Sequence, residues 1–294
     1  MDRDHLGRAR ENLFDDLWAD PTTRILPIFQ GTALLSGPSS LALLPVDAVP
    51  EGDLRVYLGR TITATATEPA GTPVVAVHLA DAGHLAEAEW ANLRQMGAKF
   101  SDRDAGMLTE ALGILNWHHS HLFSPRTGEP TLVEMGGWVR RDPVSNTEVF
   151  PRTDAAIIVG VTDASDRLLL GSNALWESNR YSLLAGFVEP GESLEAAVER
   201  EILEESGIRV VDPVYLGSQP WPFPASLMLG FMARVADDSD GAATPDGAEI
   251  LDLRWFTRDE LTAALGEIIL PGPTSIARAI VEEWYGGRID DGQW

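Results

Sequence analysis

Short runs of β-forming residues alternate with turn residues over the first part of the chain. Gly and Pro separate the runs, which is typical of strands joined by turns. The pattern predicts strands at 24–29, 32–35, 41–46, 54–63 and 73–79. From 104 to 123 the apolar residues follow a helical period instead. We therefore expect a small sheet-rich domain over residues 1–123, closed by a long helix.

The hydrophobic period disappears over 124–152, where Pro, Gly, Thr, Arg and Asp dominate. This composition predicts a linker with one short hairpin around Gly136, Gly137 and Trp138. Beyond it the pattern predicts strands at 155–161, 167–170, 211–218, 227–235 and 251–256, and helices at 193–206, 258–265 and 274–285. The order lacks a parallel βαβ rhythm, so we expect an α+β fold whose second domain, over 153–286, is a mixed sheet between helices.

The amino-acid composition excludes several classes of function. The 294 residues include 22 Lys or Arg and 45 Asp or Glu, so the net charge is −23. Such a chain lacks the basic face that tracks long nucleic acids. The sequence contains no Cys, which excludes disulfides, thiolate metal sites and a cysteine nucleophile. Lys99 is the only lysine, and no P-loop surrounds it.

The chain shows no membrane or export signal. Residues 1–20 are charged throughout, and the longest apolar runs are far shorter than the roughly 18 residues that span a bilayer. We expect a cytoplasmic protein without a membrane partner.

The helix at 193–206 carries the most informative residues. Ser193 can cap its start and Gly207 its end. Glu201, Glu204 and Glu205 are related by i,i+3 and i,i+4, which places three carboxylates on one face. Two interpretations remain open from the spacing alone. The face is either an acidic solvated surface or a site for Mg²⁺ or Mn²⁺, which prefer oxygen ligands.

The positions of the histidines favour the interpretation as a metal site. All six precede residue 122, namely His5, His78, His84, His118, His119 and His121. Acid–base chemistry in the second domain would therefore need a carboxylate beside a metal ion.

Residues 186–208 resemble the Nudix box, G-x5-E-x7-R-E-U-x-E-E-x-G-U, where U is apolar. The fixed positions are occupied by Gly186, Glu192, Arg200, Glu201, Ile202, Glu204, Glu205, Gly207 and Ile208. The resemblance implies hydrolysis of a nucleoside diphosphate linked to another group, with Mg²⁺ or Mn²⁺ as cofactor.

A second segment, 218–226, reads SQPWPFPAS. Its prolines stiffen the backbone and hold two aromatic rings, which suits either a platform for a flat base or a loop packed on the core. Beside the Nudix box it resembles the SQPWPFPxS signature of the NADH pyrophosphatases, a Nudix subfamily. Residues 115–118 (LNWH), 150–152 (FPR) and 92–94 (NLR) are similar to further segments of that subfamily.

The resemblance assigns roles residue by residue. Its catalytic set is Glu201, Glu204, Glu205, Arg200 and Glu192, in which Glu192 and Arg200 pair to tie the loop to the helix and Glu204 is a further ligand or the base. Its metal ligands are Glu201, Glu205, Glu249 and the backbone carbonyl of Ala185. Its substrate-binding set is Phe187, Gln219, Pro220, Trp221, Pro222, Phe223, Pro224, Ser226, Phe150, Ala277 and Arg94.

The chain departs from the subfamily at 124–152. Many relatives carry two C-x-x-C pairs there for a structural zinc, whereas Ser124, Thr127 and the stretch 141–146 supply no thiolate. We expect no structural zinc, and we expect His118, His119 and His121 at the surface of the helix end.

The leading hypothesis is hydrolysis of the pyrophosphate of NAD(H) to NMN(H) and AMP. RNA would be a partner only through a 5′ NAD cap, since Arg152, Arg180 and Arg209 are scattered rather than clustered. Alternatives are hydrolysis of ADP-ribose or a dinucleoside polyphosphate, and a non-catalytic NAD-binding protein. The resemblance also implies a homodimer in which Trp221 completes the partner's pocket.

Overall fold

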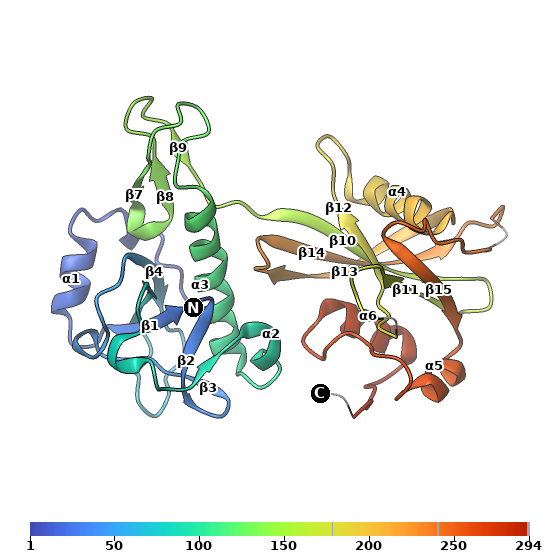
Figure 1. The fold of residues 1–294 in the computed structure, drawn as a ribbon, viewed down its shortest axis with the longest axis horizontal. Helices are drawn as coiled ribbons and strands as arrows, with labels where there is room; N and C mark the ends of the chain where they lie inside the picture. The colour runs from blue at the N-terminus through green and yellow to red at the C-terminus, as the bar shows by residue number, and fades with distance from the viewer. Residues whose placement is uncertain (178, 240, 293–294) are drawn as a thin grey trace. The chain divides into compact units, whose positions relative to one another are not determined.

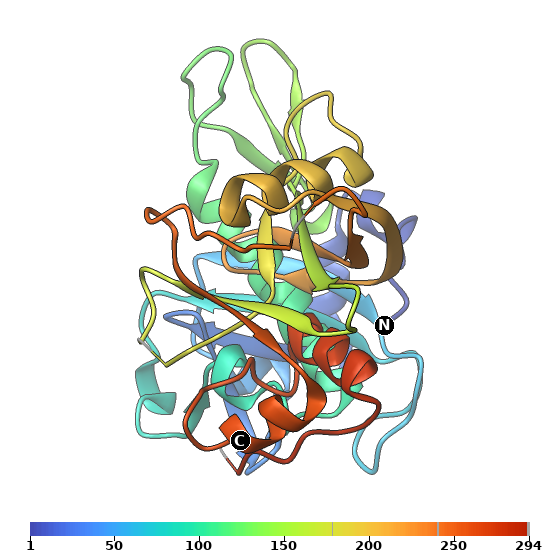
Figure 2. The same cartoon turned by 90° about the vertical axis from the view of Figure 1, so that its right-hand side faces the viewer.

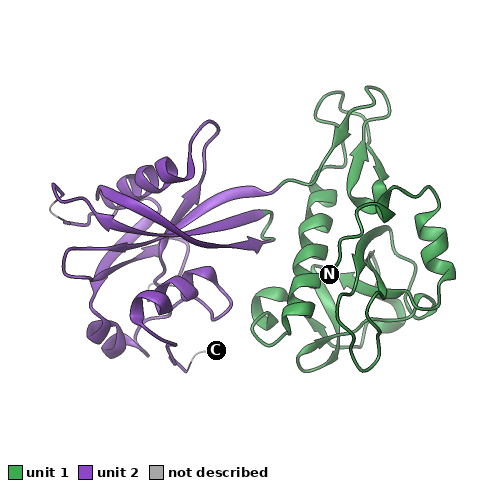
Figure 3. Ribbon diagram, turned by 180° about the vertical axis from the view of Figure 1, so that it is seen from behind, with its two compact units in different colours: residues 1–152, 222–225 green, residues 153–221, 226–294 purple. Residues whose placement is uncertain are grey.

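The chain folds into two compact units, which Figure 1 shows as ribbons and Figure 3 in separate colours. The computed structural model describes residues 1–177, 179–239 and 241–292. Unit 1 comprises Met1–Arg152 with Pro222–Ala225, and unit 2 comprises Thr153–Trp221 with Ser226–Trp294.

Unit 1 contains a six-stranded mixed sheet of order β3-β2-β1-β5-β4, with β6 paired to β2. The pair β1–β5 is parallel and the other pairs are antiparallel. Its elements are α1 (Leu13–Ala19), β1 (Arg24–Phe29), β2 (Thr32–Gly37), β3 (Ser40–Leu41), β4 (Leu54–Arg60), β5 (Pro73–Leu79), β6 (Trp90–Ala91), α2 (Leu93–Met96) and α3 (Asp102–Ser120), with short 3₁₀ turns at Gly7–Ala9, Val46–Ala48, Gly83–Leu85 and Met135–Gly137.

One helix covers each face of this sheet. Met107 and Leu108 of α3 are fully buried against Leu26 and Val56. On the opposite face, Leu13 and Leu17 of α1 pack in a second cluster. The sequence pattern predicted β1, β5 and the long helix, but it missed α1, whose seven residues are too few to show a clear period.

Residues 124–152 form a ribbon that belongs to unit 1. Its three strands β7 (Leu132–Glu134), β8 (Val139–Arg141) and β9 (Glu148–Val149) pair as one antiparallel sheet. The indole Nε1 of Trp138 donates to the Tyr57 carbonyl at 2.8 Å. This bond joins the ribbon to strand β4, so the segment is more than the simple hairpin that its composition predicted.

The expectation that His118 lies on the surface is wrong. Its side chain is buried, with 1% of its area exposed. Arg140 Nη1 donates to Nδ1 of the ring at 2.8 Å, and Nε2 donates to the Gly137 carbonyl at 2.8 Å. The ring therefore connects α3 to the ribbon and must stay neutral. Burial first, and then the Arg140 charge, lower the pKa of His118 to about 4.

Unit 2 contains a second six-stranded mixed sheet, of order β13-β14-β10-β11-β15 with β12 paired to β10. Only β10 and β14 pair in parallel among the pairs described. Its elements are β10 (Asp154–Thr162), β11 (Leu168–Asn173), β12 (Leu184–Phe187), α4 (Leu194–Ser206), β13 (Val210–Trp221), β14 (Ser226–Val235), β15 (Ile250–Phe256), α5 (Arg258–Ala264) and α6 (Ile276–Tyr285). The predicted mixed sheet between helices is confirmed.

The two faces of this sheet bury separate clusters. Ile157 and Val159 of β10 pack with α4, while Ile158 between them packs with α6. Successive strand residues point to opposite faces, so one strand supplies both cores. Figures 1 and 2 show α4 on one side of the sheet and α6 on the other.

The prolines of 218–226 do not keep that segment out of the sheet. Pro220 and Trp221 pair with Leu227 and Ser226 at the end of β13, although the pattern placed the end of this strand at 218. β13 lies at the edge of the sheet. An edge strand tolerates proline because one side of its backbone needs no partner strand.

No helix within the described ranges is long and apolar enough to cross a membrane.

The neutral His118 predicts a pH dependence of stability. Its folded pKa lies below the unfolded value of 6.5, so its contribution is complete above pH 6.5 and is lost as the pH falls toward 4. We expect the melting temperature of the wild type to fall more steeply between pH 7 and 5 than that of His118→Asn. His84→Asn, at an exposed position, should keep the wild-type slope. Equal slopes for all three proteins would contradict the assignment.

Candidate functional site

Helix α4 begins and ends as its sequence predicts. Ser193 Oγ accepts the Ala196 N–H at the start, and Gly207 adopts φ 70° at the end. Val198 and Ile202 are fully buried against the sheet. Because α4 is anchored on this face, its acidic residues are held beside strand β12 and the loop that joins the two elements.

Arg200 is the centre of an ionic network on this helix. It holds Glu192 through two bonds, from Nε at 2.8 Å and from Nη2 at 2.9 Å. Nη2 also donates to the Phe187 carbonyl at 2.9 Å, and Nη1 contacts Glu201 and Glu204 at 2.8 and 3.0 Å. The Arg200 bonds lower the pKa of Glu192 to about 2. One guanidinium thus fastens the loop at both of its ends to the helix.

The three glutamates of the helix differ in environment. Glu205 is buried, with 5% of its area exposed, whereas the Glu204 side chain is 60% exposed. Glu201 lies between these extremes, and its side chain is 13% exposed. The carboxylates therefore do not form one uniform acidic face. Glu201 and Glu205 lie toward the protein, and Glu204 lies toward solvent with Arg200.

Glu205 carries an uncompensated buried carboxyl. Its Oε2 atom is buried and has no hydrogen-bond partner in the described structure. Burial first, and then the charges of Glu249, Glu201 and Asp246, raise the pKa of Glu205 to about 8. Without a cation these surroundings favour the protonated form of this carboxyl. A positive ion close to it would remove both the repulsion and the desolvation cost.

Gly186 makes room for Glu201. A Cβ atom at Gly186 would lie 2.0 Å from Cδ of Glu201. The carboxylate therefore lies directly against the backbone of strand β12, next to Ala185. This close approach explains why a residue without a side chain is needed at that position.

A turn positions Glu249. The Asp246 carboxylate accepts the backbone N–H groups of Ala248, Glu249 and Ile250. Asn173 Nδ2 donates to Glu249 Oε1 at 3.2 Å. Sequence reasoning named Glu249 but missed Asn173, because the two are distant in sequence and meet only where β11 pairs with β15.

The donor set fits a divalent cation in chemistry but not in its present geometry. Glu201, Glu205 and Glu249 offer hard oxygen ligands, and the orphaned Oε2 atom of Glu205 has a free acceptor position. Across residues 1–177, 179–239 and 241–292, however, no three His, Asp or Glu side chains lie close enough together to hold one ion. Arg200 instead occupies an oxygen of Glu201. A bound ion would have to draw these carboxylates together.

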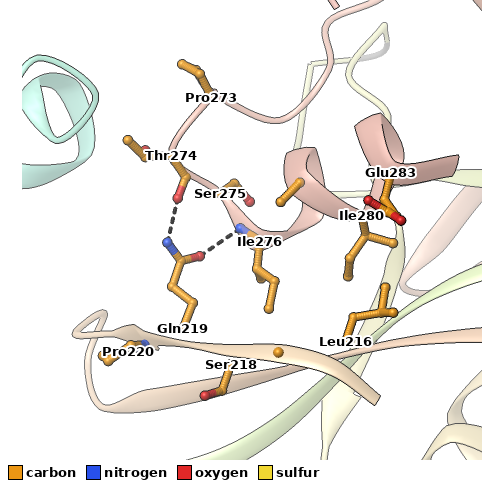
Figure 4. Close-up of a pocket in the computed structure, with 12 residues that line it drawn as sticks. Leu216, Ser218, Gln219, Pro220, Pro273, Thr274, Ser275, Ile276, Ile280 and Glu283 are labelled. Carbon is orange, nitrogen blue, oxygen red and sulfur yellow. Dashed lines mark hydrogen bonds between the residues drawn. The ribbon is translucent and has the colours of Figure 1, made fainter. Parts of the chain in front are cut away.

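A cavity of about 640 Å³ lies between β13 and the start of α6 (Figure 4). Gln219 spans this region, because its side-chain Nε2 donates to the Thr274 carbonyl and its Oε1 accepts the Ile276 N–H. Pro220 also lines the cavity, and Ile276, Ile280 and Leu216 form its apolar wall. This volume lies within the range of pockets for small organic ligands.

The other expected substrate-binding residues of unit 2 differ in their exposure to solvent. The Phe187 side chain is 58% exposed, so its ring is open to solvent. Trp221 and Ser226 face each other at the ends of β13 and β14 and are partly buried. Ala277 is buried in the core beneath α6. Its side chain therefore offers no open surface to a ligand.

Unit 1 contains the remaining expected residues. Phe150 is 59% exposed there. The Arg94 guanidinium lies over the ring of Phe223, 4.0 Å from its centroid. Asn116 Nδ2 donates to the carbonyls of Pro222 and Pro224 at 2.9 and 3.3 Å. Sequence reasoning noted Asn116 only as part of the LNWH segment and missed these contacts, which join residues 106 and 108 positions apart.

Comparisons with known proteins agree with this division of the chain. Residues 151–272 match the family described as the NUDIX domain. Residues 22–117 match the family described as the NADH pyrophosphatase-like rudimentary NUDIX domain.

Curated relatives align over most of the chain. An NAD-capped RNA hydrolase NudC from Mycobacterium bovis (strain BCG / Pasteur 1173P2) is 41% identical over 91% of this chain and 85% of its own length. The protein of the same name from Stutzerimonas stutzeri is 37% identical over 74% of this chain and 76% of its own length. NAD-capped RNA hydrolase NUDT12 from Macaca fascicularis is 35% identical over 63% of this chain and 43% of its own length.

The close approach at Gly186 can be tested directly. We expect Gly186→Ala to fold normally, because the flexible Glu201 side chain can move away from the added methyl group. The displaced carboxylate should weaken Mn²⁺ binding by about 10- to 100-fold, as losses around metal ligands do. Titration followed by electron paramagnetic resonance measures this.

Gly287→Ala is the matched control, because a Cβ there meets nothing within 4 Å. Unchanged Mn²⁺ affinity in Gly186→Ala would show that Glu201 is not a ligand.

Proposed function

Because this chain belongs to the Nudix hydrolase family, in the branch that joins a Nudix domain to an NADH pyrophosphatase-like domain, we propose that it hydrolyses the pyrophosphate of NAD(H) to NMN(H) and AMP. The observation that carries the proposal is the buried carboxyl of Glu205, whose Oε2 atom has no hydrogen-bond partner in the described structure and which lies beside Glu201 and Glu249. Such a group is costly unless a cation compensates it, so its presence favours a metal-dependent enzyme over a non-catalytic NAD-binding protein.

We propose that Glu201, Glu205, Glu249 and the Ala185 carbonyl hold Mg²⁺ or Mn²⁺. When bound, such an ion neutralises charge on pyrophosphate oxygens and lowers the pKa of water. Arg200 and Glu192 keep the loop at 187–193 in place, so that Phe187 and Ala185 keep their positions beside the helix. Glu204 is the exposed carboxylate of the set and can accept a proton from water.

The cavity beside Gln219 is the proposed place for part of the dinucleotide. Its apolar wall suits a flat ring, and the Gln219 amide supplies directional polar groups. The exposed ring of Phe187 and the partly buried ring of Trp221 are candidates to stack on a base. Ser226 and Pro220 belong to the same proposed substrate-binding set.

NAD-capped RNA is a second proposed substrate. Relatives that align over 91% and 74% of this chain are named for that activity. With a net charge of −23, the protein would hold the capped end while the RNA body stays in solvent. We also propose that the enzyme is cytoplasmic and, as the resemblance to the NADH pyrophosphatases implies, a homodimer.

A substrate panel with matched variants tests the reaction. Glu205→Gln resembles the protonated carboxyl in shape, so it should fold normally yet lose about 100-fold or more in kcat on NADH. Glu199→Gln, at an exposed position of the same helix, should keep wild-type turnover. NADH, NAD, ADP-ribose, diadenosine polyphosphates and NAD-capped RNA are compared at fixed metal with separated products. Faster turnover of ADP-ribose or a diadenosine polyphosphate than of NAD(H) would replace the proposed substrate.

The shared-site hypothesis concerns Trp221. Losing one base stack costs about 1–3 kcal/mol, so Trp221→Ala should raise the KM for NADH about tenfold or more. Mixing Trp221→Ala with Glu205→Gln protomers should restore activity, because each heterodimer then has one site with both residues intact. Wild-type-like kinetics of Trp221→Ala, or mixed dimers without any gain, would contradict the respective part of this hypothesis.

A further inference from the structure

The ribbon of unit 1 ends in two hairpin loops that meet at one buried carboxylate. In the first loop, the Ser124 N–H donates to the Glu129 carbonyl at 2.8 Å. In the second, the Asp142 N–H donates to the Thr147 carbonyl at 2.9 Å. The loops stand beside each other at the top of Figure 1. Asp142 is 0% exposed.

Three hydroxyl groups donate to a single oxygen of Asp142. Its Oδ2 accepts from Ser124 Oγ at 2.7 Å, Thr127 Oγ1 at 2.8 Å and Ser145 Oγ at 2.7 Å. With its own bond to Cγ, this oxygen has four neighbours. The two loops are therefore cross-linked at one atom by side chains from both of them.

Backbone groups complete the cluster. Asp142 Oδ1 accepts the N–H groups of Val144 and Ser145 at 2.8 and 3.1 Å. Burial alone would raise the pKa of Asp142, but the bonds from Ser124, Ser145 and Thr127 outweigh it and hold that pKa below the ordinary value. The carboxylate thus stays charged while surrounded by neutral donors, and none of these five hydrogen bonds comes from a cation.

The spacing of these residues is that of a two-knuckle metal site. Ser124 and Thr127 are separated by two residues, as are Asp142 and Ser145, and fourteen residues lie between Thr127 and Asp142. Zinc ribbons place four ligands in a closely similar pattern, C-x₂-C-x₁₅₋₂₀-C-x₂-C. The side chains present do not fit zinc, however, because three are neutral hydroxyls whose protons are committed to Asp142 Oδ2.

We propose that Asp142 Oδ2 takes the place of a structural metal ion as the hub that closes this ribbon. The side chains of the four positions meet at one point, as the ligands of a tetrahedral metal site do. Hydrogen bonds take the place of metal–ligand bonds. The hub fixes Asp142, which directly follows β8 and lies two residues after Arg140, whose side chain binds the buried ring of His118. The fold of the ribbon is consequently independent of metal.

The first experiment removes the hub charge. In Asp142→Asn an amide NH₂ must replace one of the two acceptor oxygens, so either the three hydroxyls at Oδ2 or the two backbone N–H groups at Oδ1 lose their acceptor. We expect a melting temperature lower by about 5 °C or more and at least tenfold faster amide exchange in 124–147. Glu129→Gln removes a charge from an exposed ribbon position and should change neither quantity. An Asp142→Asn protein with wild-type melting and exchange would overturn the proposal.

The second experiment restores a metal to the same positions. Because the chain has no cysteine of its own, the variant S124C/T127C/D142C/S145C contains only the designed thiols. We expect it to bind one Zn²⁺ per chain and to melt at a lower temperature in strong chelator. The wild type should bind no stoichiometric Zn²⁺ and melt identically with chelator or added Zn²⁺.

Failure of the four-cysteine variant to bind Zn²⁺ would show that the positions do not converge as a metal site, whatever the stability of Asp142→Asn. A wild type that holds one tightly bound Zn²⁺ would equally overturn the proposal.

Discussion

The candidate site depends on the interactions of the Arg200 guanidinium group. It is the cation that contacts Glu192, Glu201 and Glu204 together, and it also binds the Phe187 carbonyl. Glutamates three and four residues apart repel one another on a helix. Arg200 offsets that repulsion at the exposed side of the helix. Glu205 lies beyond its reach in the contacts described, which leaves one buried carboxyl to be compensated by something else.

The two units accommodate a buried carboxyl group in different ways. In unit 2, Glu205 keeps an oxygen without a partner and has a raised pKa. In unit 1, Asp142 is surrounded by five neutral donors and has a lowered pKa. A fully satisfied carboxylate serves to fix a structure, whereas an unsatisfied one is available for a ligand. The contrast separates a structural cluster from a candidate active site.

The sheet of unit 2 explains how distant segments reach one site. Strand β10 buries Ile157 and Val159 under α4 and Ile158 under α6, so both helices are fixed to the same central strand. Strand β12 pairs with β10 and carries Gly186 against Glu201. The pairing of β11 with β15 brings Asn173 to Glu249. The rigid layers therefore set the positions of loops whose own sequences contain little structural information.

The sequence alone determined the elements whose signals are local. Helix α4, its caps at Ser193 and Gly207 and the spacing of its glutamates follow from residues within one or two turns of each other. Strands such as β1 and β5 follow from their apolar runs. The same local patterns sufficed for the mixed sheet and for the resemblance to the Nudix family.

Only the tertiary structure decided which polar groups are buried, because burial depends on partners far along the chain. His118 becomes a core residue through Gly137 and Arg140. Asp142 accepts a hydrogen bond from Ser124, which lies 18 positions away in the sequence. Pro220 can be part of a strand because β13 lies at the edge of the sheet of unit 2. Such outcomes follow from packing between elements, which no short window of sequence records.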